Sequence, residues 1–277
     1  MIEIKNLTKK FDDFTAVDDL SLTIKTGEFF GLLGPNGAGK TTTISMVSKL
    51  LLPTQGEILI DGERLTRKRP ALKRKISVIT QEYSMRQDMT MDEIMEYQGR
   101  LYFMPVKKIR EKSEELLEFC ELLPFRNRKV RHLSGGMKRK LMVCRALLTD
   151  PEILLLDEPT AGMDALSRRQ MWNLLRQLND RNLTILLTTH YMEEAQSLCE
   201  RVAMLQHGRL EEVNTPQGMI EALGCYTVDH MTAAGTVSRY FHERGQAITY
   251  LSKLEGKCTL RDTTLDDVFI ERAAQKK

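Results

Sequence analysis

The chain has 277 residues, of which 41 are Lys or Arg and 38 are Asp or Glu, so its formal net charge is only +3. This length allows one large α/β domain or one domain with a small appendage, and so small a charge does not indicate a nucleic-acid-binding protein. No apolar run approaches the ~18 residues that span a bilayer, and the N-terminus lacks the features of a signal peptide, so we expect an intracellular protein.

The first half of the chain predicts strands followed by helices. Residues 1–33 alternate apolar residues with turn signals, which is typical of short antiparallel strands, and further strands are predicted over 56–62 and 76–79. A helix is predicted from Lys40 to Leu51, where Pro53 stops it. Apolar residues recur at helical spacing from Met91 to about Cys120, and another helix should begin near Ser134. We therefore predict an α-helical subdomain over about residues 82–146.

Strands and helices alternate in the second half. Apolar runs at 153–156, 184–187 and 202–205 are typical of a parallel sheet covered by helices. The pattern changes after Pro216, where we predict a helix over 232–243, a hairpin over 248–260 and a last helix over 265–273. The sequence thus predicts an α/β fold with a main domain over 1–220 and a small α+β appendage over 221–277.

A phosphate-binding loop follows the apolar run at residues 29–33. Residues 34–41 match G-x-x-x-x-G-K-[ST] at every constrained position. Glycines let backbone N–H groups surround a phosphate chain, and the N-terminus of the following helix favours an anion. Lys40 should reach the β- and γ-phosphates, and the Thr41 hydroxyl should contact Mg²⁺. The predicted ATP-binding residues here are Gly34, Pro35, Asn36, Gly37, Ala38, Gly39, Lys40, Thr41 and Thr42.

Two acids follow the apolar run at residues 153–156. Asp157 is placed to hold Mg²⁺ directly or through water, and Glu158 to orient or deprotonate an attacking water. Alone, this pattern would fit a strand that ends in a solvated acidic turn. A phosphate loop in the same chain favours the catalytic interpretation.

The segment Leu133-Ser134-Gly135-Gly136-Met137 precedes Asp157 by about twenty residues. Together with the phosphate loop, it resembles the ATP-binding-cassette (ABC) family, whose LSGGQ signature takes this place. The resemblance covers roughly residues 1–220 and implies a P-loop NTPase (RecA-like) core with a mixed sheet, an antiparallel β subdomain and an α-helical signature subdomain. Met137 replaces the family's commonest glutamine, which the signature tolerates if the Ser134 hydroxyl and the following N–H groups bind the anion.

The resemblance also implies roles for single residues. Phe11 matches the aromatic residue that stacks on adenine, with a core aromatic as the alternative. Gln81 matches the Q-loop, which links Mg²⁺ and water to the helical subdomain, with an ordinary surface glutamine as the alternative. His190 matches the switch histidine that contacts the γ-phosphate. The implied catalytic residues are Glu158, His190, Gln81 and Lys40, the implied metal ligands are Thr41, Gln81 and Asp157, and the implied contacts to a nucleotide on a second subunit are Ser134, Gly135, Gly136 and Asp164.

The implied activity is ATP hydrolysis between two cassettes, with ATP and Mg²⁺ as cofactors. ATP would close a dimer, expected to be a homodimer, and hydrolysis would open it. Because the chain lacks a membrane span, a transporter requires separate permease subunits, docked near Gln81 and residues 89–102 at the cytoplasmic face of the membrane. The amino-acid sequences of residues 133–141, 188–195 and 264–270 resemble the corresponding motifs in the ATP-binding subunits of type-2 (ABC-2) exporters of the drug-resistance and nodulation-factor kind.

Two alternatives stay open at this point. A soluble ABC ATPase acting on ribosomes or DNA is the first, and the basic cluster Arg64–Lys75 is the one feature that favours it. The cluster has no interleaved aromatic residues, so a solvated face or one near anionic lipid headgroups fits better, and no nucleic-acid partner is expected. A regulatory cassette that binds ATP without turnover is the second, against which the presence of Glu158 and His190 argues.

Overall fold

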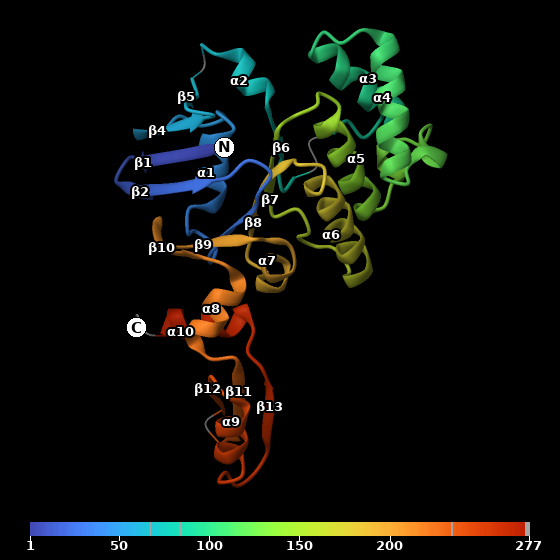
Figure 1. Ribbon diagram of the computed structural model, residues 1–277. Helices are drawn as coiled ribbons and strands as arrows, with labels where there is room; N and C mark the ends of the chain where they lie inside the picture. The colour runs from blue at the N-terminus through green and yellow to red at the C-terminus, as the bar shows by residue number, and fades with distance from the viewer. Residues whose placement is uncertain (67, 83–84, 234, 275–277) are drawn as a thin grey trace. The chain divides into compact units, whose positions relative to one another are not determined.

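The computed structural model describes residues 1–66, 68–82, 85–233 and 235–274, and the chain divides into two compact units (Figure 1). The first unit contains Met1–His190 and Ala203–Glu212, and the second contains Tyr191–Val202 and Val213–Lys277. Within the described ranges, no helix combines the length and the apolar character needed to cross a membrane. The predicted boundary between the main domain (1–220) and the appendage (221–277) falls inside the second unit, and this domain division stays a prediction.

A six-stranded sheet in the order β10-β9-β3-β8-β7-β6 carries the phosphate loop. Strands β3, β8, β7 and β6 pair in parallel, and every residue of β3, β7 and β8 is buried. Continuous apolar runs suit such strands because helices cover both faces of a parallel sheet. The strands are β3 (Phe29–Leu33), β6 (Ile76–Ile79), β7 (Ile153–Asp157), β8 (Thr184–Thr189), β9 (Arg201–Gln206) and β10 (Arg209–Asn214).

The first unit also contains a four-stranded sheet in the order β2-β1-β4-β5, in which every pair of neighbours is antiparallel. This sheet and the helices α3, α4 and α5 lie on opposite sides of β6, β7 and β8 in Figure 1. The arrangement agrees with the predicted antiparallel strands near the N-terminus. The strands are β1 (Ile2–Phe11), β2 (Phe14–Ile24), β4 (Gln55–Ile60) and β5 (Glu63–Arg64).

Polar caps set where the helices of the first unit begin. Thr90 and Glu93 form a reciprocal capping box at the start of α3, and Ser134 accepts a hydrogen bond from the Met137 N–H at the start of α5. Helix α1 packs against β7 and β8, while α3, α4 and α5 pack on one another. All three lie in or just beyond the range of about 82–146 that we predict to be a helical subdomain, and the division into subdomains stays a prediction. The helices are α1 (Lys40–Val47), α2 (Pro70–Arg74), α3 (Met91–Leu101), α4 (Val106–Phe119), α5 (Gly135–Leu147) and α6 (Ala165–Asn179), with 3₁₀ turns at Leu123–Phe125 and Val130–His132.

The second unit joins a group of helices to a small sheet. Helices α7, α8 and α10 pack on one another, and α9 packs on the antiparallel sheet β12-β11-β13. Phe241 and Tyr250 bring their ring centroids to 5.3 Å where α9 meets β12. The elements are α7 (Met192–Leu198), α8 (Pro216–Leu223), β11 (Tyr226–Thr232), β12 (Gly235–Phe241), α9 (Arg244–Leu251), β13 (Cys258–Asp262) and α10 (Leu265–Ala274).

Three element predictions need correction. The helix predicted over 232–243 is wrong, because Thr232 ends β11 and residues 235–241 form strand β12, whose Val237, Tyr240 and Phe241 favour a strand. The hairpin predicted over 248–260 is also wrong, because α9 continues to Leu251 and only β13 follows. Helix α1 ends at Val47 instead of Leu51. The last helix was predicted correctly.

Candidate active site

The loop between β3 and α1 has a backbone that only glycine adopts easily. Gly39, at the N-cap of α1, has φ 99°, and a Cβ there would lie 2.5 Å from the Ala16 carbonyl oxygen. Gly37 also has a positive φ, 82°, but a Cβ there would meet no atom within 4 Å. The loop is therefore closely packed behind Gly39 and open at Gly37, as a loop that receives a ligand requires.

Lys40 is buried in this loop, with only 5% of its surface exposed. Its Nζ donates hydrogen bonds to the carbonyl oxygens of Gly34 (2.8 Å) and Pro35 (3.1 Å), and it lies 3.8 Å from Glu158 Oε1. Burial lowers the pKa of Lys40, and the charges of Glu158 and Asp157 oppose that shift. The ammonium group is thus held where a phosphate would compete for it.

Asp157 ends β7 directly beside the first turn of α1. Its Oδ1 accepts hydrogen bonds from the hydroxyl groups of Thr188 (2.6 Å) and Thr41 (3.1 Å), and only 4% of the residue is exposed. Hydroxyl and carboxylate oxygens suit Mg²⁺, which keeps most of its coordination sphere for water and phosphate. Within the described ranges, no group of three or more His, Cys, Asp or Glu side chains is placed to hold a metal ion, and Mg²⁺ binding by Thr41 and Asp157 stays a prediction.

Glu158 and His190 meet next to the loop. Glu158 Oε1 lies 3.1 Å from His190 Nδ1, and the Glu158 carboxylate is nearly buried, with 11% of the side chain exposed. The Glu158 backbone is left-handed, with φ 47°, and its N–H donates to the Thr188 carbonyl oxygen at 3.0 Å. A carboxylate, an imidazole and an ammonium group therefore converge at the ends of two parallel strands, where ligands of open α/β sheets bind.

One pocket collects these side chains. It has a volume of about 450 Å³ and is lined by Phe14, Ala16, Asn36, Gly37, Gly39, Lys40, Thr41, Thr42, Gln81, Glu158, Ala161 and His190. Phe14 forms the register pair with Phe11 across the β1–β2 turn, and the two residues are 63% and 44% exposed. Of these two aromatic residues, Phe14 lines the pocket. We therefore add Phe14 to Phe11 as a candidate for stacking on a base.

Sequence reasoning missed Arg139, which ties the Gln81 loop to the signature helix. Arg139 lies in α5, is 2% exposed, and donates to the carbonyl oxygens of Thr80 (2.8 Å) and Gln81 (3.1 Å). A buried guanidinium group is costly unless it is hydrogen-bonded, so these bonds fix the backbone at Gln81 to α5. An arginine within the run Lys138-Arg139-Lys140 carries no signal that would single it out as buried.

The residues predicted to act on a second nucleotide lie apart from this pocket. Ser134 and Gly135 are exposed at the start of α5, and Asp164 caps α6 by accepting hydrogen bonds from the N–H and hydroxyl of Ser167. A Cβ at Gly136 would lie 3.3 Å from the Ser167 hydroxyl, so the two helix starts adjoin. Their predicted role in trans stays a prediction.

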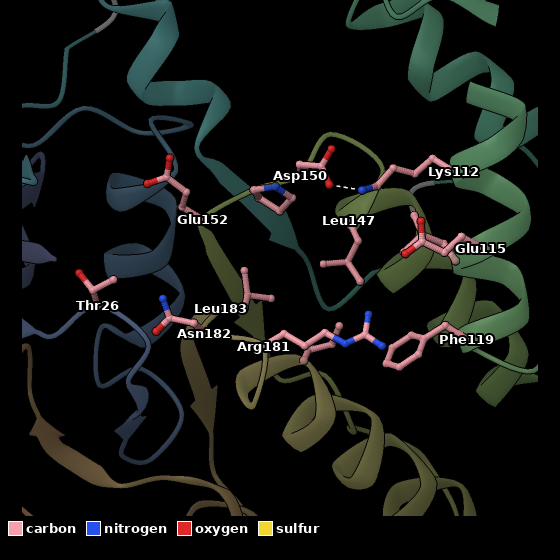
Figure 2. Close-up of a pocket in the computed structure, with 13 residues that line it drawn as sticks. Thr26, Lys112, Glu115, Phe119, Leu147, Asp150, Glu152, Arg181, Asn182 and Leu183 are labelled. Carbon is pink, nitrogen blue, oxygen red and sulfur yellow. Dashed lines mark hydrogen bonds and ion pairs between the residues drawn. The ribbon is translucent and has the colours of Figure 1, made fainter. Parts of the chain in front are cut away.

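A second pocket, also of about 450 Å³, lies at the opposite ends of the parallel strands (Figure 2). Its lining includes Thr26 and Glu152, just before β3 and β7. Arg181 lies 4.4 Å from the Phe119 ring centroid, and Lys112 forms an ion pair with Asp150. The two pockets therefore do not differ in volume, and what distinguishes the first is that Lys40, Glu158 and His190 all line it.

Comparison with known proteins agrees with this choice. Residues 17–161 match the ABC transporter family. The chain is 41% identical over 229 residues to a Nod factor export ATP-binding protein I from a Rhizobium species, covering 82% of this chain and 75% of that protein. The protein of the same description from Cupriavidus metallidurans is 38% identical over 230 residues, covering 83% and 76%. The chain belongs to the ABC transporter family. It is an ATP-hydrolysing subunit similar to export ATPases.

Solved cassettes of the family share the fold. The dimeric structure of a bacterial ABC transporter cassette has a TM-score of 0.70 and 31% identity, and the match covers 78% of this chain and 98% of that one. A post-hydrolysis state of an ATP-binding cassette, bound to ADP and Pi, gives 0.69 and 31% over the same shares. These likenesses confirm the predicted fold class and ATPase activity, and they do not favour a soluble ATPase that acts on ribosomes or DNA.

Proposed function

We propose that this chain is the ATP-hydrolysing subunit of an ABC-2-type exporter, which works as a homodimer on a separate membrane permease. The observation that carries the proposal is the convergence of Lys40, Asp157, Glu158 and His190 on the phosphate loop, in a chain similar to Nod factor export subunits. The proposed location is the cytoplasmic face of the membrane, where the permease holds the chain.

Each residue has a proposed task in hydrolysis. The open backbone at Gly37 and the Lys40 ammonium group bind the phosphate chain, with Thr41 and Asp157 as ligands of Mg²⁺, which would neutralise charge on the phosphates. Glu158 orients the attacking water and accepts its proton, and His190 holds the Glu158 carboxylate in place and senses the γ-phosphate. Gln81 lines the pocket and reports its state to α5 through the Arg139 hydrogen bonds.

The exposed signature supports the dimer. Ser134 and Gly135 stand at the N-terminus of α5, a thirteen-residue helix whose dipole favours an anion. Because these residues lie outside the pocket of their own chain, a nucleotide held by a second copy is the proposed ligand. Dimer closure would exclude water and bring Ser134 to the γ-phosphate, and loss of that phosphate would let the two copies separate.

The proposed permease contact is the exposed face of α3 beside the Gln81 loop. Met91 and Met95 are buried, so they belong to the core of the helical subdomain, whereas Tyr97 is 53% exposed and Leu101 is 55% exposed. Tyr83, which lies near Gln81 in the sequence and belongs to the same proposed contact, is outside the described residues. A helix of the permease would find in Tyr97 and Leu101 the apolar contacts that an exposed helix face offers a partner.

The test is to purify the tagged chain from membranes of its own cells in mild detergent and to identify what co-purifies in equal amount. We expect a multi-span membrane protein, and we expect Tyr97→Glu to reduce its recovery by at least tenfold. Met231→Glu is the matched control, because Met231 is 54% exposed in the second unit and should leave recovery unchanged. Recovery with ribosomes or DNA, or without a membrane protein, would reject the transporter assignment while ATPase activity stands.

A further inference from the structure

The segment Arg64–Lys75 combines seven cationic side chains with no acidic one. Apart from Arg67, which lies outside the described residues, the cations are Arg64, Lys68, Arg69, Lys73, Arg74 and Lys75, and all of these except the half-buried Lys75 are exposed. Two leucines anchor the segment from inside, because Leu65 is 1% exposed and Leu72 is 6% exposed. The backbone is therefore fixed to the core while the charges remain at the surface.

Only some of these charges are neutralised within the protein. Arg64 pairs with Glu57 at 3.2 Å, Arg69 pairs with Glu63, and Lys75 pairs with Asp61 and Glu152 at 3.1 and 2.9 Å. Lys68, Lys73 and Arg74 form no ion pair with any residue in the described part of the chain. Three exposed cations thus carry an uncompensated positive charge around α2.

An exposed apolar group lies next to these cations. Arg74, Tyr102, Met104 and Lys108 line one shared hollow of about 150 Å³, so the end of α2 adjoins the turn between α3 and α4. Thr149 and Asp150 complete the lining, and the Asp150 carboxylate is paired with Lys112. In that turn Phe103 is 88% exposed and has a left-handed backbone, with φ 58°. Figure 1 shows α2 and this turn at the same end of the first unit, at the top of the view.

Unpaired cations around an exposed phenylalanine are suited to a membrane surface. Lysine and arginine attract anionic headgroups, while phenylalanine and leucine enter the boundary between headgroups and acyl chains. Leu101 and Val106, which are 55% and 38% exposed, extend the apolar part of the surface. Although Phe103 offers a ring on which a base could stack, the exposed Leu101 and Val106 beside it have no counterpart in a nucleic acid and favour a lipid.

We propose that Lys68, Lys73, Arg74 and Lys108, which flank Phe103, form a surface that contacts the anionic phospholipid headgroups of the membrane. The orientation rests on the proposed function, since a permease would hold this end of the cassette towards the bilayer. The cationic surface would then add affinity for lipid to the protein contacts made by Tyr97. One cation near an anionic membrane is worth about a fivefold gain in binding, so four are worth several hundredfold.

The test is sedimentation of the full chain with vesicles of phosphatidylcholine alone or with 30% phosphatidylglycerol, at low and at physiological salt. We expect binding that needs phosphatidylglycerol and weakens with salt, and we expect Lys73→Gln with Arg74→Gln to lower it about 25-fold. Phe103→Ser should also lower vesicle binding, and its relative effect should be larger at physiological salt, where the charges are screened more strongly. Lys253→Gln with Lys257→Gln, which removes the same charge from exposed sites in the second unit, should leave it unchanged.

Three outcomes would overturn the inference. These are equal binding to both vesicle types, equal losses in the two double variants, and binding of duplex DNA or RNA that exceeds binding to vesicles. A control with inorganic phosphate at matched ionic strength distinguishes a lipid-binding surface from a site for free phosphate. Phosphate should release the chain from the vesicles only if the surface is a site for free phosphate. Vesicle binding without a co-purifying permease would reject the proposed function and leave this inference standing, and the reverse result would reject only this inference.

Discussion

Each unit contains a cluster in which a cationic side chain lies beside two carboxylates, and the two clusters differ in how closely the cation is paired. In the first unit, Lys40 lies 3.8 Å from Glu158 and is bonded mainly to backbone carbonyl oxygens, beside an open pocket. In the second unit, Arg261 forms close ion pairs at 2.7 Å with both Asp229 and Asp267. Arg261 donates two hydrogen bonds to each carboxylate, and Ser238 donates another to Asp229.

The difference lies in how completely each cation is paired. Arg261 has its donors occupied by carboxylates that it neutralises, and its pKa is raised by those hydrogen bonds. Lys40 keeps a pKa lowered by burial, with its nearest carboxylate beyond hydrogen-bonding distance. A saturated cluster stabilises a fold, whereas an incompletely paired one beside a cavity can exchange its partner for a ligand.

The largest expected effect is at the incompletely paired cluster. Glu158→Gln removes the base and keeps the size of the side chain, so we expect ATP turnover to fall by about 10²–10⁴-fold while ATP binding is retained. Glu152→Gln, at a side chain that is 59% exposed, is the control. Turnover and nucleotide affinity are measured on the same preparation, and unchanged turnover in the Glu158 variant would remove this residue from the catalytic role.

At the saturated cluster, the expected effect is on stability alone. Arg261→Met leaves Asp229 and Asp267 without their shared cation, and we expect a loss of about 2–3 kcal/mol, below the value for a fully buried pair because 39% of the Arg261 side chain is exposed. Hydrogen exchange of the β11 and β13 amides should accelerate, while ATP affinity should stay the same. Lys253→Met is the control. If exchange is unaffected, the cluster does not stabilise the unit.

The contrast also explains what the sequence could predict. The phosphate loop and the acids after β7 were recognisable because ligand chemistry fixes their residue types and spacing. Arg139 was missed because its role is set by the carbonyl oxygens that it meets, and those depend on tertiary packing. In the second unit, we predicted a helix and then a hairpin where the structure has strand β12 and then helix α9. Whether a short segment of mixed propensity forms a helix or a strand depends on the element it packs on, and the local sequence does not contain that information.

A smaller effect would settle which aromatic residue contacts the base. If Phe14, which lines the pocket, stacks on adenine, Phe14→Ala should weaken ATP binding about fivefold or more, and Phe11→Ala should do less. The reverse order would support the role that the family resemblance gives to Phe11. Phe11 also lies 4.9 Å from the Lys9 ammonium group, so its removal could alter the hairpin. Comparing affinities for ATP and for inorganic triphosphate isolates the stacking contribution, because only ATP has a base.

The smallest expected effect concerns two adjacent acids at the start of α10. Burial raises the pKa of Asp266, and the charges of Asp267 and Glu193 add to that shift. Burial acts in the same direction on Asp267, but hydrogen bonds from Arg261 and Thr264 outweigh it and lower its pKa below the ordinary value of 3.8. The ionised form is therefore favoured by folding at Asp267 and disfavoured at Asp266.

The signs of the two pH effects are opposite. Ionised Asp267 stabilises the fold above about pH 4, and this contribution is lost as the pH falls through its lowered pKa. Asp267→Asn should therefore destabilise the second unit at pH 7, and progressively less as the pH falls below about 4. Ionised Asp266 costs stability at pH 7, so Asp266→Asn should be stabilising there, with a gain that vanishes at low pH. Both effects are measured as the free energy of unfolding of each variant across this pH range. If both substitutions destabilise the protein at pH 7, the ionised form of Asp266 does not cost stability.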